Sequence, residues 1–142
     1  EKKKFKINTR IVAYSAILVF LIGLLTTLLL QRTEIETTVF RVPGMLYQMQ
    51  PNDKVSNLYN FQIVNKTFED IVPELKIEDG VGEIKIIGNE IKVSKNKLAE
   101  GTFFIELPKS EIKSMKTKLV IEIYSKGKLI DRVKTNFLGP AN

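Results

Sequence analysis

The chain has 142 residues, of which 22 are Lys or Arg and 16 are Asp or Glu, and it contains no His, Cys or Trp. This length holds one ordinary domain and an appendage. The missing side chains exclude nucleophile–His pairs, zinc sites with nitrogen or sulfur ligands, and iron–sulfur clusters or disulfides held by this chain. We therefore expect no catalytic residue and no cofactor site here. Because the first residue is Glu1 rather than Met, we also expect a processed product or a piece of a longer protein.

Residues 11–30 form an apolar run without one charged side chain. A helix of this length covers about 30 Å, which matches the hydrocarbon thickness of a bilayer. Thr26 and Thr27 are tolerated in such a helix because their hydroxyls can bond back to helix carbonyls. The run predicts a transmembrane helix, with the lipid bilayer as its partner; a buried core helix and an uncut signal segment are the alternatives.

The flank formed by residues 1–10 carries a net charge of +4. By the positive-inside rule this flank stays in the cytoplasm, so residues 31–142 are predicted to lie on the periplasmic side of a bacterial inner membrane, or in the equivalent space of another cell. The lysines of the flank either grip anionic headgroups or act only as this topology signal.

Beyond residue 33 the pattern changes to short runs of period two, separated by Gly, Pro and Asn, which is typical of strands. Gly88-Asn89 predicts a tight hairpin between two of these runs, and Gly127 predicts a turn between the last two. The segment 109–116 is predicted to be a helical turn or a loop. The predicted strands cover residues 34–41, 57–65, 74–78, 83–87, 90–95, 102–107, 118–124 and 129–137.

Seven or eight strands at short, regular intervals favour an antiparallel immunoglobulin-like β-sandwich over residues 31–142, and an OB-like barrel is the main alternative. This region has 17 basic and 15 acidic residues that alternate along the chain, so we expect no nucleic-acid partner. The pair Asn65 and Thr67 satisfies the glycosylation sequon, but by default such side chains bond the local backbone at the end of a strand.

The apolar stretch from Pro43 to Met49 interrupts the strand pattern. It either plugs one end of the sandwich or forms an exposed contact patch. The partner-contact candidates are Pro43, Leu46, Tyr47 and Met49. Thioethers bind Cu(I), so Met45, Met49 and Met115 are candidate copper ligands. The alternative is that these methionines only pack against other side chains.

Three stretches carry a resemblance to a known family. They follow the charge-free span in a fixed order: an R-x-P-G-x-L-Y-Q box from Arg41 to Gln48, then S-N-L-Y-N-F-Q-I-V-N-K-T from Ser56 to Thr67, and F-L-G-P from Phe137 to Pro140. Together they resemble the C-terminal portion of the FixG/CcoG family of cytochrome c oxidase accessory proteins.

The resemblance implies a polytopic bacterial inner-membrane protein with a part that binds two [4Fe–4S] clusters, then a last span and a periplasmic immunoglobulin-like domain. It also implies a role in oxidase assembly, and reduction of copper for the oxidase has been attributed to members of this family. Because this chain has no Cys, the cluster-binding part is expected upstream of Glu1.

Three hypotheses follow for residues 31–142. The first is a non-catalytic interaction domain that docks oxidase subunits or other assembly factors. The second is a Cu(I)-handling domain that uses the three methionines. The third is a structural spacer that stabilises the full-length protein and recognises nothing. If the upstream part does not exist, a single-pass membrane protein with an outer structural or binding domain is the alternative. An enzyme confined to these residues is the least favoured class.

Overall fold

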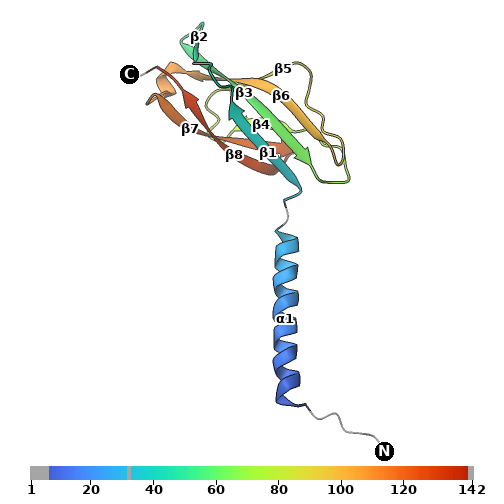
Figure 1. Ribbon diagram of the computed structural model, residues 1–142. Coiled ribbons are helices and arrows are strands. Elements are labelled where there is room, and N and C mark those ends of the chain that lie inside the picture. Colours follow the sequence, from blue (N-terminus) through green and yellow to red (C-terminus); the bar gives the residue numbers. More distant parts are fainter. Residues whose placement is uncertain (1–6, 32, 141–142) are drawn as a thin grey trace, which may run out of the picture. The chain divides into compact units, whose positions relative to one another are not determined.

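The computed structural model describes residues 7–31 and 33–140, and its contacts divide the chain into two compact units, residues 1–33 and 34–142. The first unit is helix α1, Thr9–Leu30 (Figure 1), which is long and apolar enough to cross a membrane. None of its described residues is buried. As expected, Thr26 Oγ1 donates to Ile22 O and Thr27 Oγ1 donates to Gly23 O, each at 2.8 Å.

The second unit is a β-sandwich of eight strands, and every strand pairing in it is antiparallel. The larger sheet has the order β1-β3-β6-β5, with β2 also paired to β3, and the smaller sheet has the order β4-β7-β8 (Figure 1). Two separate sheets confirm the predicted sandwich and not the barrel alternative. The strands are β1 Ile35–Arg41, β2 Gln48–Gln50, β3 Lys54–Asn65, β4 Glu74–Ile77, β5 Glu83–Ile87, β6 Leu98–Pro108, β7 Lys116–Ser125 and β8 Lys128–Leu138, with a 3₁₀ turn η1 at Lys109–Glu111.

The core lies between the two sheets because the strands alternate buried and exposed side chains. On β3 and β6, the rings of Tyr59 and Phe103 stack with their centroids 5.5 Å apart. From the facing sheet, Ile121 and Ile123 of β7 are completely buried against them. This alternation, visible in the sequence, is what assigns one face of each sheet to the core.

The last turn is as predicted and the predicted hairpin at Gly88-Asn89 is wrong. Lys126 and Gly127 both have positive φ, 51° and 75°, which joins β7 to β8 by a two-residue turn. At the other site, β5 pairs with β6 instead of with residues 90–95, which form no strand. Ile91 and Val93 alternate because both enter the core, and Val93 makes only an isolated bridge to Ile71.

Polar side chains of β3 tie the two sheets together. Asn57 is buried, and its Nδ2 donates to Leu138 O at 2.7 Å while its Oδ1 accepts from Leu138 N at 3.2 Å. Tyr59 Oη donates to Asn136 O at 2.9 Å, so two residues of β3 hold β8 from across the core. At the sheet edge, Thr37 N donates to Asp131 Oδ2 at 2.8 Å. The side-chain amide of Asn57 therefore substitutes for a backbone bridge between the sheets.

Candidate functional site

The stretch from Pro43 to Met49 forms a loop whose backbone is fixed at both ends. Arg41 Nη1 donates to the carbonyl of Met45 and so spans the turn at Pro43-Gly44, where Gly44 has a φ of 78°. The loop then runs into β2, which pairs with the start of β3. This edge hydrogen bonding was missed in the sequence because β2 is only three residues long.

The side chains of this loop divide between two roles that the sequence left as alternatives. Tyr47 is half-buried and packs against the core, so it covers the end of the sandwich. Leu46 and Met49 point outward, with 74% and 54% of their surface exposed, and Pro43 is exposed as well. The loop thus both plugs the sandwich and presents apolar side chains to solvent.

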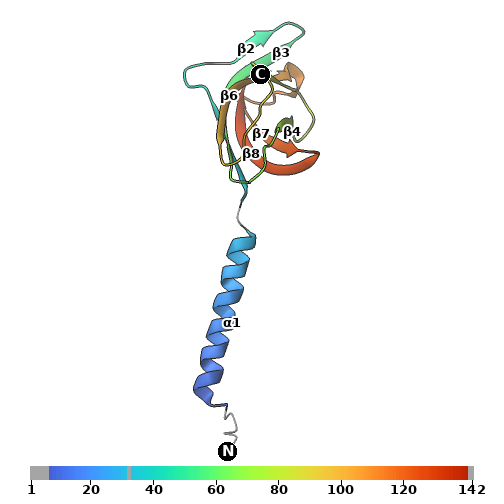
Figure 2. The same ribbon diagram turned by 90° about the vertical axis from the view of Figure 1, so that its right-hand side faces the viewer.

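Met115 lies at the same end of the sandwich as β2. Its carbonyl accepts from Gly139 N at 3.2 Å, directly after Leu138, which Asn57 holds beside the start of β3. Figures 1 and 2 both show β2 and the C-terminal end of β8 at one end of the domain. Met115 is 65% exposed and Met45 is half-buried. The fold therefore brings the three methionines to one end, and their binding of copper stays a prediction.

The motifs that carry the family resemblance form the polar framework of the sandwich. The N-L-Y-N run contributes Asn57 and Tyr59, and the F-L-G-P run contributes the backbone of Leu138 that Asn57 holds. A Cβ on Gly139 would lie 2.5 Å from Ile112 Cγ2, so only glycine fits there. The motifs at residues 56–67 and 137–140 are thus in contact although they are far apart in the sequence.

Asn65, the sequon residue, is 1% exposed and has a structural role. Its Nδ2 donates to Glu69 O at 2.7 Å and to Val93 O at 3.2 Å, and its Oδ1 accepts from Thr67 N at 2.9 Å. These contacts confirm the expectation that the pair Asn65 and Thr67 bonds the local backbone.

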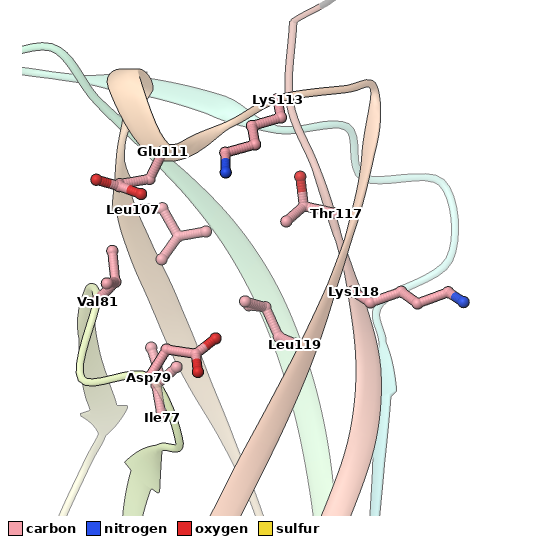
Figure 3. Close-up of a pocket in the computed structure, with 9 residues that line it drawn as sticks. All are labelled: Ile77, Asp79, Val81, Leu107, Glu111, Lys113, Thr117, Lys118 and Leu119. Carbon is pink, nitrogen blue, oxygen red and sulfur yellow. The ribbon is translucent and has the colours of Figure 1, made fainter.

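A small recess opens between the sheets near η1 (Figure 3), and no sequence motif marks it because its residues come from four separate segments. Its volume is about 180 Å³. Among the residues that the structure describes, none of its charged side chains has an ion-pair partner, and Thr117 Oγ1 is buried without a hydrogen-bond partner. The recess is lined by Ile77, Asp79, Val81, Leu107, Glu111, Lys113, Thr117, Lys118 and Leu119.

A network of ionic and hydrogen-bonded side chains lies on the outer face of the smaller sheet. Tyr124 Oη donates to Glu122 Oε2 at 2.7 Å, and Arg132 Nη2 lies 2.7 Å from Glu122 Oε1. The hydroxyl and then the guanidinium hold the pKa of Glu122 below its ordinary value, and the same hydrogen bond raises the pKa of Tyr124. A carboxylate stabilised in its charged form is a poor general base at neutral pH, so this cluster is a structural network.

The structure offers no group of three or more His, Cys, Asp or Glu side chains placed to hold a metal, as far as residues 7–31 and 33–140 are concerned. The loop with its exposed apolar side chains is the candidate contact surface.

Comparison with known proteins identifies the domain. Residues 25–140 match the family described as "IG-like fold at C-terminal of FixG, putative oxidoreductase". Among solved structures, the chain is similar to the FixG-related protein from Vibrio parahaemolyticus, with a TM-score of 0.55 and 17% identity over 74% of this chain and 95% of that one. No curated protein matches the chain. The match over most of the chain shows that it belongs to the family of immunoglobulin-like domains at the C-terminal end of FixG.

Proposed function

We propose that residues 34–142 are a non-catalytic docking domain of a cytochrome c oxidase accessory protein, and that they bind an oxidase subunit or another assembly factor. The contact surface is the docking end, defined as the exposed side chains of Leu46, Met49 and Met115. The observation that carries the proposal is that all three are more than half exposed on a backbone fixed by hydrogen bonds.

The physical argument is preorganisation. Large apolar side chains are unfavourable when exposed to water, and the free energy of the system falls when a partner covers them. Because Arg41 and the pairing of β2 with β3 already order this loop, binding costs little further conformational entropy. Methionine is also enriched at interfaces because its thioether adapts to irregular surfaces.

In this proposal helix α1 anchors the domain to the inner membrane with residues 1–10 in the cytoplasm and the sandwich in the periplasm. The supporting observations are the unburied apolar helix and the charge of the flank before it. The iron–sulfur clusters of the full-length protein would then belong to a segment outside these residues.

The test is a pair of matched variants of the full-length protein. Leu46→Ser with Met49→Ser removes two of the three apolar side chains of the docking end. Phe68→Ser with Leu98→Ser removes two side chains that are 85% and 50% exposed at the opposite end of β3. Each variant is measured for protein level and for assembled oxidase in a strain lacking the native protein.

We expect the first variant to lower oxidase assembly at unchanged protein level and the second to leave both unchanged. A photoreactive residue at position 46 should also crosslink to an oxidase subunit or assembly factor. Equal behaviour of the two variants would contradict docking through this end. If deletion of the domain lowered only protein level, the spacer hypothesis would be the better one.

A second candidate function is Cu(I) handling, favoured by the placement of Met45, Met49 and Met115 at one end. Replacing all three by Leu keeps apolar side chains of similar volume and removes the thioether ligands. Loss of copper retention with docking preserved would support copper handling, and unchanged copper retention would exclude it.

A further inference from the structure

Three lysines lie together on the outer face of the smaller sheet. Lys116 and Lys118 are two residues apart on β7, and Lys134 of β8 pairs with Val120, the next outward position. All three are exposed, whereas the alternate residues Leu119 and Ile121 face the core. Figure 3 shows Lys118 extending away from the recess, on the other side of its strand from Leu119. Lys116 and Lys118 are about 7 Å apart along β7, and Lys134 is a diagonal neighbour of Lys118, about 7–8 Å away. These three side chains are here called the lysine patch.

The lysine patch is uncompensated, whereas the basic groups Arg132 and Lys76 on the same sheet are paired. Among the described residues, none of its three amines has an ion-pair partner. On the same sheet, Arg132 is paired with Glu122 and Glu78. On the strands of the larger sheet, Lys54 pairs with Glu83, and Lys85 pairs with Glu106 and Glu83. Lys95 and Lys97, beside the start of β6, have no ion-pair partner among the described residues.

The patch adjoins the docking end. Lys116 directly follows Met115 and pairs with Leu138, the residue that Asn57 holds.

We propose that the partner that covers the docking end is a polypeptide with an acidic surface, and that this acidic surface binds the lysine patch. This inference rests on the proposed function and adds the charge of the partner to it. The apolar side chains supply the contact, and the three amines attract and orient a partner that carries carboxylates beside its own apolar patch. An uncompensated cluster next to an apolar surface is the complement of such a partner, whereas the ion-paired faces of the domain are not.

The test uses the full chain in phosphatidylcholine nanodiscs and a fluorescein-labelled peptide of alternating Glu and Leu. The variants are the triple reversal Lys116→Glu, Lys118→Glu and Lys134→Glu, its milder Gln counterpart, and a control reversal, Lys95→Glu with Lys97→Glu. The control lysines are exposed, without an ion-pair partner among the described residues, and lie beside the start of β6, at the opposite end of β3. A peptide with Lys in place of Glu serves as the probe control.

We expect the triple reversal to weaken binding about tenfold or more, the Gln variant to weaken it less, and the control reversal to change it less than about twofold. Raising salt from about 50 to about 500 mM should weaken binding to the unmodified chain and not to the triple reversal. Equal losses in the two reversals, or equal binding of the Lys peptide, would overturn the inference. So would loss of peptide binding in phosphatidylglycerol nanodiscs, which would assign the patch to lipid headgroups.

The variant Leu46→Ser with Met49→Ser separates this inference from the proposed function. If this variant keeps salt-dependent binding of the acidic peptide but does not lower oxidase assembly, the lysine patch acts as inferred and the proposed role of the docking end is wrong. If it loses peptide binding while the triple reversal keeps it, the docking end stands and the lysine patch does not select charge.

Discussion

The substitution Asn57→Asp tests the tie between the two sheets, because it replaces the amide that donates to Leu138 by an oxygen that cannot donate. In the native domain, Nδ2 lies 2.7 Å from Leu138 O, and Oδ1 accepts from Leu138 N at 3.2 Å. After the change a carboxylate oxygen faces a carbonyl oxygen at that short distance. The tie is thereby converted into a repulsive contact at a position that is 2% exposed.

The expected loss can be worked from these contacts. The donated hydrogen bond contributes about 1 kcal/mol, and leaving a buried acceptor unpaired beside a buried charge costs roughly 2–4 kcal/mol more. We therefore expect the free energy of unfolding to fall by about 3–5 kcal/mol, out of the 5–15 kcal/mol that is usual for a domain. The loss should shrink at acid pH, since a protonated carboxyl can donate again.

The measurement is urea unfolding of residues 34–142 followed by tyrosine fluorescence and far-UV circular dichroism. Asn60→Asp is the matched control: it lies three residues along the same strand and is half-buried, and its Oδ1 only accepts, from Thr102 Oγ1 at 2.9 Å. A carboxylate keeps that bond, so the control should lose less than about 1 kcal/mol. Similar unfolding midpoints for the two variants would refute the reasoning.

Three further predictions concern single residues. Burial raises the pKa of Tyr59, so the contribution of its hydroxyl to stability is present below the unfolded pKa of about 10 and is lost as pH rises through the folded pKa. Tyr59→Phe should lower the free energy of unfolding by about 1 kcal/mol at neutral pH, because it removes the hydrogen bond to Asn136 O. In melting experiments at several pH values, the variant should lose less stability on the alkaline side than the native domain. The pKa of Glu122 is lowered, so the contribution of its carboxylate to stability is present above the unfolded pKa of about 4.3 and is lost as pH falls through the folded pKa. Glu122→Gln should therefore reduce the loss of unfolding free energy at acid pH. An unchanged dependence of stability on pH would contradict the proposed network. Gly82→Ala should destabilise the domain by about 2–4 kcal/mol in thermal unfolding, because the new Cβ would lie 2.4 Å from Leu107 Cδ2 at a φ of 104°. Gly80→Ala is the control: its Cβ would meet open space, so it should cost only about 1 kcal/mol. Equal costs for the two variants would show that the close approach to Leu107 does not limit the substitution.

The strand pattern was largely predictable because each strand of this sandwich has one buried and one exposed face. Leu119, Ile121 and Ile123 alternate with outward residues in the sequence and are all buried in the structure. The same rule failed at residues 90–95, where Ile91 and Val93 alternate without strand pairing. Period two reports that alternate side chains enter the core, and it does not report which backbone, if any, lies alongside.

The candidate surfaces were predictable only in part. The apolar loop was visible because Pro43 and Gly44 interrupt a strand pattern, but the division of labour between Tyr47, which packs on the core, and Leu46, which is exposed, required the fold. The recess near η1 had no signal, because its side chains come from segments that share no motif.

The sequence by itself determined the apolar helix, the sandwich class and the family, because hydropathy, periodicity and short motifs are local properties of the chain. Only the tertiary structure decided that Asn57 meets Leu138, that Met115 lies at the same end of the sandwich as β2, and that three lysines of β7 and β8 gather into the lysine patch. These are contacts between strands far apart in the chain. Their register depends on the pairing and packing of whole sheets, which no local pattern encodes.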